Sequence, residues 1–289
     1  MSFVTTVEPF DPGFGPLVDT TVRVAAWNIW ARYAVWERRG PLIEAALRAA
    51  APDIALLVEV WEEPGGRSQA MELAAALGDY EYVYASNLTF PDGTCAGNAI
   101  LSRWPIVRSE IRTLPRDAPN GARDDDGEER LCLFAELDGP RGPIQTFCAH
   151  LSWREDHGSI RQAQVRAIAE FARDMRPRAF PAILGGDLNA APDTDEIRML
   201  TGRAGTPVPG IWFRDAWEHG GDGPGFTWSN TNPWAATSLD VDRRIDYLLV
   251  GHPKLGGVGH VVNAELLGDE PVDAMFPSDH FGLVADLRY

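Results

Sequence analysis

Residues 180–190 of this chain read FPAILGGDLNA. It opens with a short apolar run, a pattern typical of a buried strand. Two glycines, Gly185 and Gly186, are then expected to break the strand and to let the backbone turn tightly. Asp187 and Asn189 lie two residues apart, so in extended backbone they point to the same side. A carboxylate and an amide at a strand end suit a metal-bound water and a phosphate oxygen, which predicts the edge of an active site.

A helix is expected directly after this stretch. Asp193 and Glu196 have the spacing of a capping box, and Pro192 precedes them. Taken alone, however, Gly-Asp-x-Asn favours an ordinary Asx turn with no catalytic role, because a match of four residues is common by chance.

Further stretches share this design, in which an apolar strand ends or begins at polar functional groups. They are Val22 to Trp27 followed by Asn28, Ile54 to Val58 followed by Glu59, a strand entered through Gly97 and Asn98, Ile144 to Ala149 followed by His150, Arg244 to Val250 with Asp246, and Phe276 to His280 leading into a strand from Phe281 to Leu287. Strands interleaved with a few helices favour two sheets face to face with helices outside, and leave a single doubly wound sheet open.

In this order, the segments resemble the endonuclease/exonuclease/phosphatase superfamily, which has the fold of deoxyribonuclease I. The resemblance runs from about Val22 to the C-terminus. It implies an α/β four-layer sandwich, in which two mixed β-sheets pack face to face with helices on the outside. We expect one catalytic domain over residues 22–289, preceded by an N-terminal arm over residues 1–21, because motifs so far apart in the chain must meet at one site.

The resemblance also implies a metal site. Glu59, with Asn28 and Asp279, corresponds to the main Mg²⁺ site, and Mn²⁺ is an alternative. Carboxylate and amide oxygens favour these hard cations over zinc. Many relatives have Gln before the glutamate, whereas Val58 stands there in this chain. Because side chains alternate along a strand, we expect Val58 to point away from Glu59 and the metal site to survive.

The remaining roles follow from the same resemblance. Asp187 is expected to orient or deprotonate the attacking water, and Asn189 to bind the phosphate or a second metal. His280 is expected to contact the scissile phosphate, with Asp246 holding its imidazole in orientation. His150 is expected to donate to a second phosphate oxygen. Each residue also has an ordinary explanation: for example, His150 could be a core histidine, and Asp246 could pair with a neighbouring arginine.

Substrate-binding residues are the least constrained part of the prediction. Asn98 lies in a strand that lines the site in relatives. Trp30, Trp61 and Trp153 follow predicted strand ends, where loops line a phosphate pocket, so we expect them to form an aromatic wall for a ring-bearing or apolar leaving group.

Helices are predicted over Pro41 to Ala51, Arg67 to Leu77 and Ser159 to Asp174, the last opened by a capping box of Ser159 and Gln162. The polar residues 115–129, which include three consecutive aspartates, are interpreted as a solvated connector, with a lid near the site as the alternative.

Charge and cysteine content limit the function classes. The 289 residues carry 42 acidic and 26 basic side chains, a formal net charge of −16. This balance disfavours a nucleic-acid substrate without excluding one. Cys95, Cys132 and Cys148 are odd in number and lack metal-like spacing, so we expect reduced thiols in a cytoplasmic protein. We expect no signal peptide in residues 1–21, no membrane-spanning segment, and a monomer.

These features together predict a divalent-metal-dependent phosphodiesterase or phosphatase. Its substrate would be a phosphate ester of a small molecule or of a lipid head group, attacked by an activated water. A nuclease acting on DNA or RNA is the alternative, and a catalytically silent binding protein of the same fold is a further one.

Overall fold

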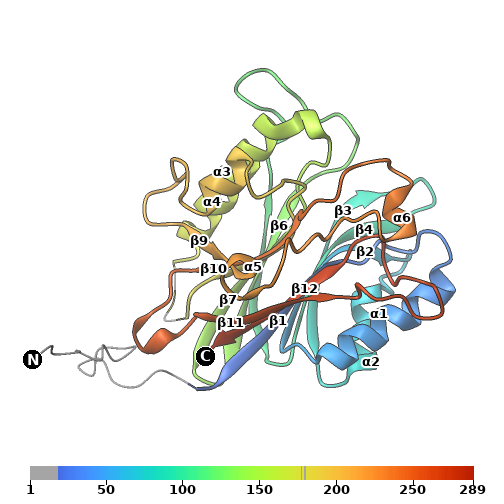
Figure 1. Ribbon diagram of the computed structural model, residues 1–289, viewed down its shortest axis with the longest axis horizontal. Helices are drawn as coiled ribbons and strands as arrows, with labels where there is room; N and C mark the ends of the chain where they lie inside the picture. Colours follow the sequence, from blue (N-terminus) through green and yellow to red (C-terminus); the bar gives the residue numbers. More distant parts are fainter. Residues whose placement is uncertain (1–18, 177, 179) are drawn as a thin grey trace, which may run out of the picture.

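The computed structural model describes residues 19–176, 178 and 180–289 (Figure 1). Most of the predicted N-terminal arm, residues 1–18, therefore lies outside the described residues. The first strand, β1, begins at Thr21. Among the described residues, no helix combines the length and the apolar character needed to cross a bilayer.

Two six-stranded sheets form the centre of the molecule. The first has the order β11 (Val261–Leu267), β12 (Gly282–Arg288), β1 (Thr21–Asn28), β2 (Ile54–Glu62), β4 (Cys95–Ser102) and β3 (Glu81–Thr89). The second has the order β5 (Ile106–Thr113), β6 (Leu131–Gly139), β7 (Gly142–Ala149), β8 (Ile183–Asp187), β10 (Asp246–Gly251) and β9 (Phe213–Asp215). Both are mixed, because β1 and β2 pair in parallel, as do β7 and β8, while the other pairs are antiparallel.

Helices cover the outer faces of this sandwich (Figure 1). They are α1 (Trp36–Ala50) and α2 (Gln69–Leu77) on the first sheet, and α3 (Gly158–Asp174) and α4 (Asp195–Leu200) on the second. Shorter helices lie in the C-terminal third, namely α5 (Ala216–Gly220), α6 (Pro233–Ala236) and the single 3₁₀ turn η3 (Leu255–Gly257), and another turn, η2 (Glu155–His157), precedes α3.

Alternation along the strands builds this layering. In β1, Val22, Val24 and Ala26 face the second sheet, whereas Ala25 and Trp27 face α1. Three apolar clusters result, one between the sheets and one under each helical layer. The predicted four-layer sandwich is confirmed, and the single doubly wound sheet is ruled out.

The two glycines of residues 180–190 have a different role from the one predicted. Gly185 and Gly186 lie inside β8 and do not break it. A Cβ on Gly185 would lie 2.7 Å from Cδ1 of Leu56 in the opposite sheet. Gly186 has φ +129°, and a Cβ there would lie 2.1 Å from the carbonyl oxygen of Ala149. The glycines therefore let β8 approach β7 and the first sheet closely.

Helix starts differ most from the sequence prediction. The first helix begins at Trp36 and includes Pro41 instead of starting there. Neither predicted capping box forms. The Ser159 hydroxyl donates to Asn120, and the Glu196 carboxylate accepts from Arg161 at 2.7 Å. These side chains form tertiary contacts in place of local caps.

Candidate active site

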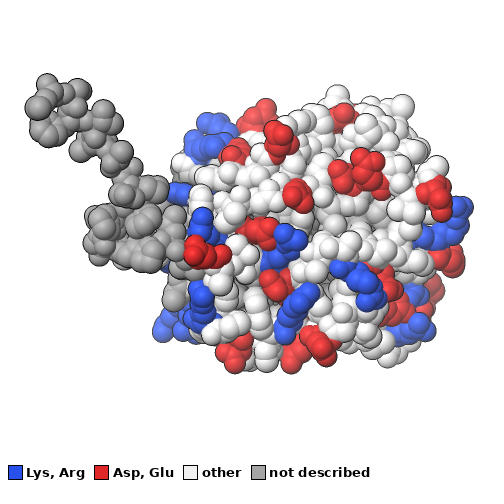
Figure 2. All heavy atoms as spheres, turned by 60° about the horizontal axis from the view of Figure 1, so that its bottom comes forward, with Lys and Arg blue, Asp and Glu red and all other residues white. Residues whose placement is uncertain are grey.

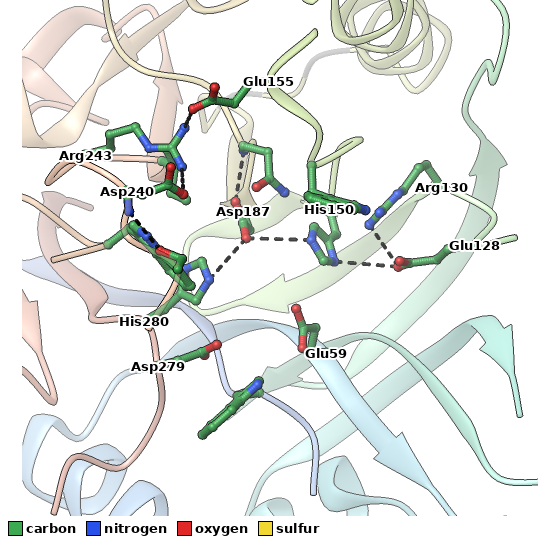
Figure 3. Close-up of a pocket in the computed structure, with 16 residues that line it drawn as sticks. Glu59, Glu128, Arg130, His150, Glu155, Asp187, Asp240, Arg243, Asp279 and His280 are labelled. Carbon is green, nitrogen blue, oxygen red and sulfur yellow. Dashed lines mark hydrogen bonds and ion pairs between the residues drawn. The ribbon is translucent and has the colours of Figure 1, made fainter. Parts of the chain in front are cut away.

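The sheet topology brings the predicted site residues to one edge of the sandwich. Strands β1, β2, β7 and β8 end at this edge, while β10 and β12 run antiparallel to their neighbours and begin there. A cavity of about 460 Å³ opens over the edge (Figure 3). Its lining consists of Trp30, Glu59, Glu128, Arg130, His150, Trp153, Glu155, Asp187, Asn189, Trp228, Ser238, Asp240, Arg243, Ile245, Asp279 and His280.

Asp187, Asp246 and His280 form the centre of the site. The register of β8 against β10 places Asp187 opposite Asp246. Nδ1 of His280 lies 2.9 Å from Oδ2 of Asp246, and its Nε2 lies 3.8 Å from Oδ2 of Asp187. Burial opposes charge on the imidazole, but the two carboxylates outweigh it and raise the pKa of His280 well above its usual value. The two carboxylates therefore favour the charged form of the His280 imidazole.

Asp187 lines the cavity, is 1% exposed and is held by polar partners. Its carboxylate accepts from Nδ2 of Asn28 at 3.1 Å and from the backbone N–H of Asn189 at 2.9 Å. Burial and the neighbouring Asp246 raise the pKa of Asp187 to about 7. The Asx turn is therefore present, and the same carboxylate also lies in the site. Asn189 is not extended as expected but left-handed, with φ +49°.

His150 approaches Asp187 from the other side. Its Nε2 lies 3.6 Å from Oδ2 of Asp187. Burial, together with the charges of Arg130 and His280, lowers the pKa of His150 well below its usual value. The Asp187 carboxylate therefore lies between two imidazoles, 3.6 Å from His150 and 3.8 Å from His280, whose pKa values are shifted in opposite directions.

A β-bulge turns Glu59 into the cavity. The strand β2 does not end before Glu59 but continues to Glu62, with a register shift between Leu57 and Val60. Glu59 has φ +53°, a conformation uncommon for a residue with a side chain. Val58 stays in the core between the sheets, as expected.

Glu59 and Asp279 fit a hard divalent cation. Both carboxylates line the cavity, and they face each other across its floor (Figure 3). Burial and the charge of Glu59 raise the pKa of Asp279 to about 7 against the opposing effects of His280 and Arg39. An oxygen-rich pair of carboxylates with this mutual repulsion is the donor set that Mg²⁺ or Mn²⁺ stabilises.

Asn28 has a different orientation from the one expected for a metal ligand. Its Oδ1 accepts the backbone N–H of Trp30 at 3.0 Å. Its Nδ2 is therefore turned toward the carboxylates, and donates to Glu59 at 2.9 Å and to Asp187. The structure places Asn28 as a donor that links the two acids, with its amide oxygen bound to the backbone of Trp30 and not turned toward a cation.

Two predicted substrate-binding residues lie away from the cavity. Asn98 is fully buried opposite the bulge and donates to the carbonyl oxygens of Leu131 and Cys148, both at 3.3 Å. Trp61 packs on Phe90 with ring centroids 5.5 Å apart and does not line the cavity.

Trp30 and Trp153 do line the cavity, as expected, and Trp228 joins them. The Trp228 ring lies edge-on to the imidazole of His280, with centroids 4.8 Å apart. Nothing in the local sequence pattern distinguishes Trp228 from Trp212 or Trp217. The position of Trp228 depends on an isolated antiparallel β-bridge between Trp228 and Arg243.

The loop over residues 115–129 is more than a solvated connector. Glu128, together with Arg130 immediately after the loop, lines the cavity, and Asp124 is buried. Burial raises the pKa of Glu128 to about 7, although Arg130 opposes the shift. In the sequence, only the run Glu128-Glu129-Arg130 ahead of β6 could have indicated that these residues line the site, and such a short charged run is weak evidence by itself.

Asp246 does not pair with a neighbouring arginine, because both arginines before it in the sequence have other acidic partners. Arg244 pairs with Asp215 at 2.6 Å. Arg243 pairs with Asp240 at 2.9 Å and with Glu155 at 3.2 Å. His280 is therefore the charged partner of Asp246.

Comparison with known proteins agrees with this geometry. A model of the Endonuclease/Exonuclease/phosphatase family matches residues 25–280. The chain belongs to this family. Members of the Endonuclease/Exonuclease/phosphatase family are hydrolases of phosphoesters and typically use a divalent metal.

Solved structures of similar shape include family members from bacteria and animals. An endonuclease/exonuclease/phosphatase from Beutenbergia cavernae is 26% identical with a TM-score of 0.67, over 93% of this chain and 71% of that one. Truncated TDP2 from Caenorhabditis elegans is 20% identical with a TM-score of 0.69, over 94% and 99%. Among curated proteins, the uncharacterized protein YbhP of Escherichia coli K12 is 33% identical over 111 residues, which span 38% of this chain and 39% of YbhP.

Proposed function

We propose that this family member is a divalent-metal-dependent phosphoesterase that cleaves a phosphate ester of a small molecule or lipid head group by attack of water. The observation that carries the proposal is the position of Asp187. Its carboxylate, with a pKa of about 7, lies between the charged His280 and the neutral His150. A general base with this pKa is matched to neutral pH.

Glu59 and Asp279 are the residues proposed to hold Mg²⁺ or Mn²⁺. The bound cation would supply Lewis-acid stabilisation of charge on the phosphate. Asn28 keeps the Glu59 carboxylate in place through its hydrogen bond of 2.9 Å. It serves as a positioning residue in this proposal, which replaces its expected role as a ligand.

The other polar residues have separate roles in the proposed reaction at the phosphate. Asp187 accepts the proton of the attacking water. The imidazolium of His280, oriented by Asp246, donates a hydrogen bond to a phosphate oxygen and stabilises the charge that develops there. His150 donates to a second oxygen as a neutral imidazole. The side-chain amide of Asn189 donates to the Leu151 carbonyl at 3.1 Å, which fixes it beside the base for contact with the phosphate.

Trp30 and Trp153 are proposed to form the aromatic wall for the ester group. Such a wall binds ground and transition states about equally, so Trp30→Ala and Trp153→Ala should each raise KM about tenfold and leave kcat nearly unchanged. Trp61→Ala is the matched control, because Trp61 packs on Phe90 outside the cavity. Equal effects of all three variants would contradict the assignment.

The class of reaction can be tested directly. Hydrolysis of a bis-aryl phosphodiester and of an aryl phosphomonoester should require Mg²⁺ or Mn²⁺, stop with chelator and return on adding the metal. Glu59→Gln should raise the metal concentration needed for half-activity. Full activity after exhaustive dialysis against chelator would remove the metal from the proposal, and no hydrolysis of either ester would favour a silent binding protein.

Three free cysteines, two of them buried, support our proposal of a cytoplasmic location, and we further propose a monomer.

A further inference from the structure

The three consecutive aspartates at 124–126 do not form a uniform acidic run. Asp124 is buried and accepts a hydrogen bond from the hydroxyl of Ser152, in the turn that follows β7. Asp125 is exposed, and its carboxylate makes no hydrogen bond or ion pair with any described residue. Asp126 is an exposed residue, but its side chain is only 16% exposed because it lies against its neighbours. Two of the three acids therefore attach the loop to the turn that carries His150 and Trp153.

Asp126 holds two side chains that line the cavity. Its Oδ2 accepts from Nε1 of Trp153 at 3.1 Å and from Nη2 of Arg130 at 3.3 Å. Trp153 is 58% exposed, so packing alone leaves its ring free to turn. Among the described residues, Asp126 is the one hydrogen-bond acceptor of this indole N–H.

The contacts of Asp126 continue to the catalytic histidine. Nη1 of Arg130 donates to Glu128 at 2.9 Å, and Oε1 of Glu128 lies 3.9 Å from Nδ1 of His150 (Figure 3). Arg130 is fully buried, so this guanidinium is fixed in position. Glu128 thus holds Arg130 on the side of the site where His150 lies, whereas Asp126 is the acid that reaches Trp153 in the aromatic wall.

We infer that Asp126 is a positioning residue that fixes the Trp153 ring as a wall of the cavity and so selects phosphate esters bearing a ring. This inference rests on the proposed function, because it assumes that the cavity binds phosphate esters. A hydrogen bond at the indole N–H removes rotational freedom from the ring, and a ring that is already oriented binds an aromatic group at a lower entropic cost. The effect belongs to binding and leaves the chemical step unchanged.

The test compares Asp126→Ala with Asp125→Ala, a matched control at the neighbouring position. Calorimetry in the presence of Mg²⁺ measures binding of phenylphosphonate and of methylphosphonate, which differ in the ring alone. We expect Asp126→Ala to weaken phenylphosphonate binding about tenfold and to leave methylphosphonate binding unchanged. Asp125→Ala should change neither. If Asp126→Ala leaves the ratio of the two affinities unchanged, whether both weaken equally or neither changes, the inference is overturned.

A second measurement works without any ligand and without turnover. The indole N–H signal of Trp153 in a ¹H–¹⁵N spectrum can be assigned with Trp153→Phe. It should shift in Asp126→Ala, move less in Asp126→Asn, which keeps one acceptor oxygen, and stay in place in Asp125→Ala. An unmoved signal in both Asp126 variants would refute the contact. If the protein hydrolyses no ester, these two measurements still decide whether Asp126 positions the ring.

Discussion

Asp187 combines two features that a short motif cannot show together, an Asx turn and a buried base. Its amide contacts to Asn28 and Asn189 hold the carboxylate still, while burial and Asp246 raise its pKa from 3.8 to about 7. Because the protonated form cannot accept a proton from water, activity should be lost as the pH falls through this value.

The pH profile of kcat/KM tests this assignment. We expect it to rise with pH through about 7 and to stay high above that, since the pKa of His280 lies well above its usual value and the imidazole keeps its proton. Asp187→Asn should lower kcat by at least about 10²-fold and remove the acidic limb. A flat profile between about pH 5 and pH 8, or retained activity in the folded Asn variant, would contradict it.

His280 and Asp246 are expected to act as one unit. The separation of 2.9 Å between Nδ1 and Oδ2 means that the carboxylate orients the ring and stabilises its charge. His280→Ala should lower kcat by at least about 10²-fold, and Asp246→Asn should act through the same imidazole. The double variant should therefore lose much less than the sum of the two free-energy changes. Strict additivity would show that the two residues work independently.

At the scale of elements, alternation of apolar residues was sufficient to predict most strands and the face each one buries. Trp27, for instance, points to the helical layer and Asn28 to the site. The bulge at Glu59 was not predictable, because a left-handed residue in a strand has no local sequence signature. The prediction of where helices start was wrong for another reason. Glu196 pairs with Arg161 of a different helix, and this ion pair replaces the predicted capping box.

The site shows the same division between local and tertiary information. Residues at strand ends, such as Asp187 and His150, could be predicted because the sheet edge brings them together. Arg130 and Trp228 could not, because loops carry them to the cavity through contacts with distant parts of the chain.

Arg39 shows how the first helix supports the site. Its buried guanidinium donates six hydrogen bonds to five carbonyl oxygens. Four of these oxygens lie in residues 29–33 after β1, where Tyr33 accepts twice, and the fifth belongs to Pro277 before β12. These two segments carry Trp30 and Asp279. Burial lowers the pKa of Arg39 to about 10, so the group remains charged at neutral pH.

Removing this guanidinium should destabilise the fold. We expect Arg39→Met to lower the free energy of unfolding by about 3 kcal/mol or more, because several buried carbonyl groups lose their donor. Arg38→Met, at the exposed neighbouring position, should change it by less than about 0.5 kcal/mol. Denaturant unfolding of both variants measures the difference. Similar stabilities would mean that water replaces the guanidinium without cost.

At the scale of the whole molecule, the charge distribution bears on the choice between small esters and nucleic acid. The net charge is −16, with 42 acidic against 26 basic side chains. On the face drawn in Figure 2, Lys and Arg side chains alternate with Asp and Glu and do not form a continuous stripe. The cavity lining repeats this balance, with two arginines against six carboxylates.

We therefore expect weak binding to duplex DNA. Proteins that bind duplexes do so through several Lys or Arg contacts to phosphates, and each contact makes the affinity more dependent on salt. With a large negative charge and paired arginines, the dissociation constant should be no tighter than about 10⁻⁵ M at physiological salt. Fluorescence anisotropy of a short labelled duplex, measured with Asp187→Asn to prevent cleavage, gives this value at two salt concentrations. Submicromolar binding that weakens steeply with salt would reveal a local basic surface and would place the nuclease ahead of the small-molecule phosphoesterase.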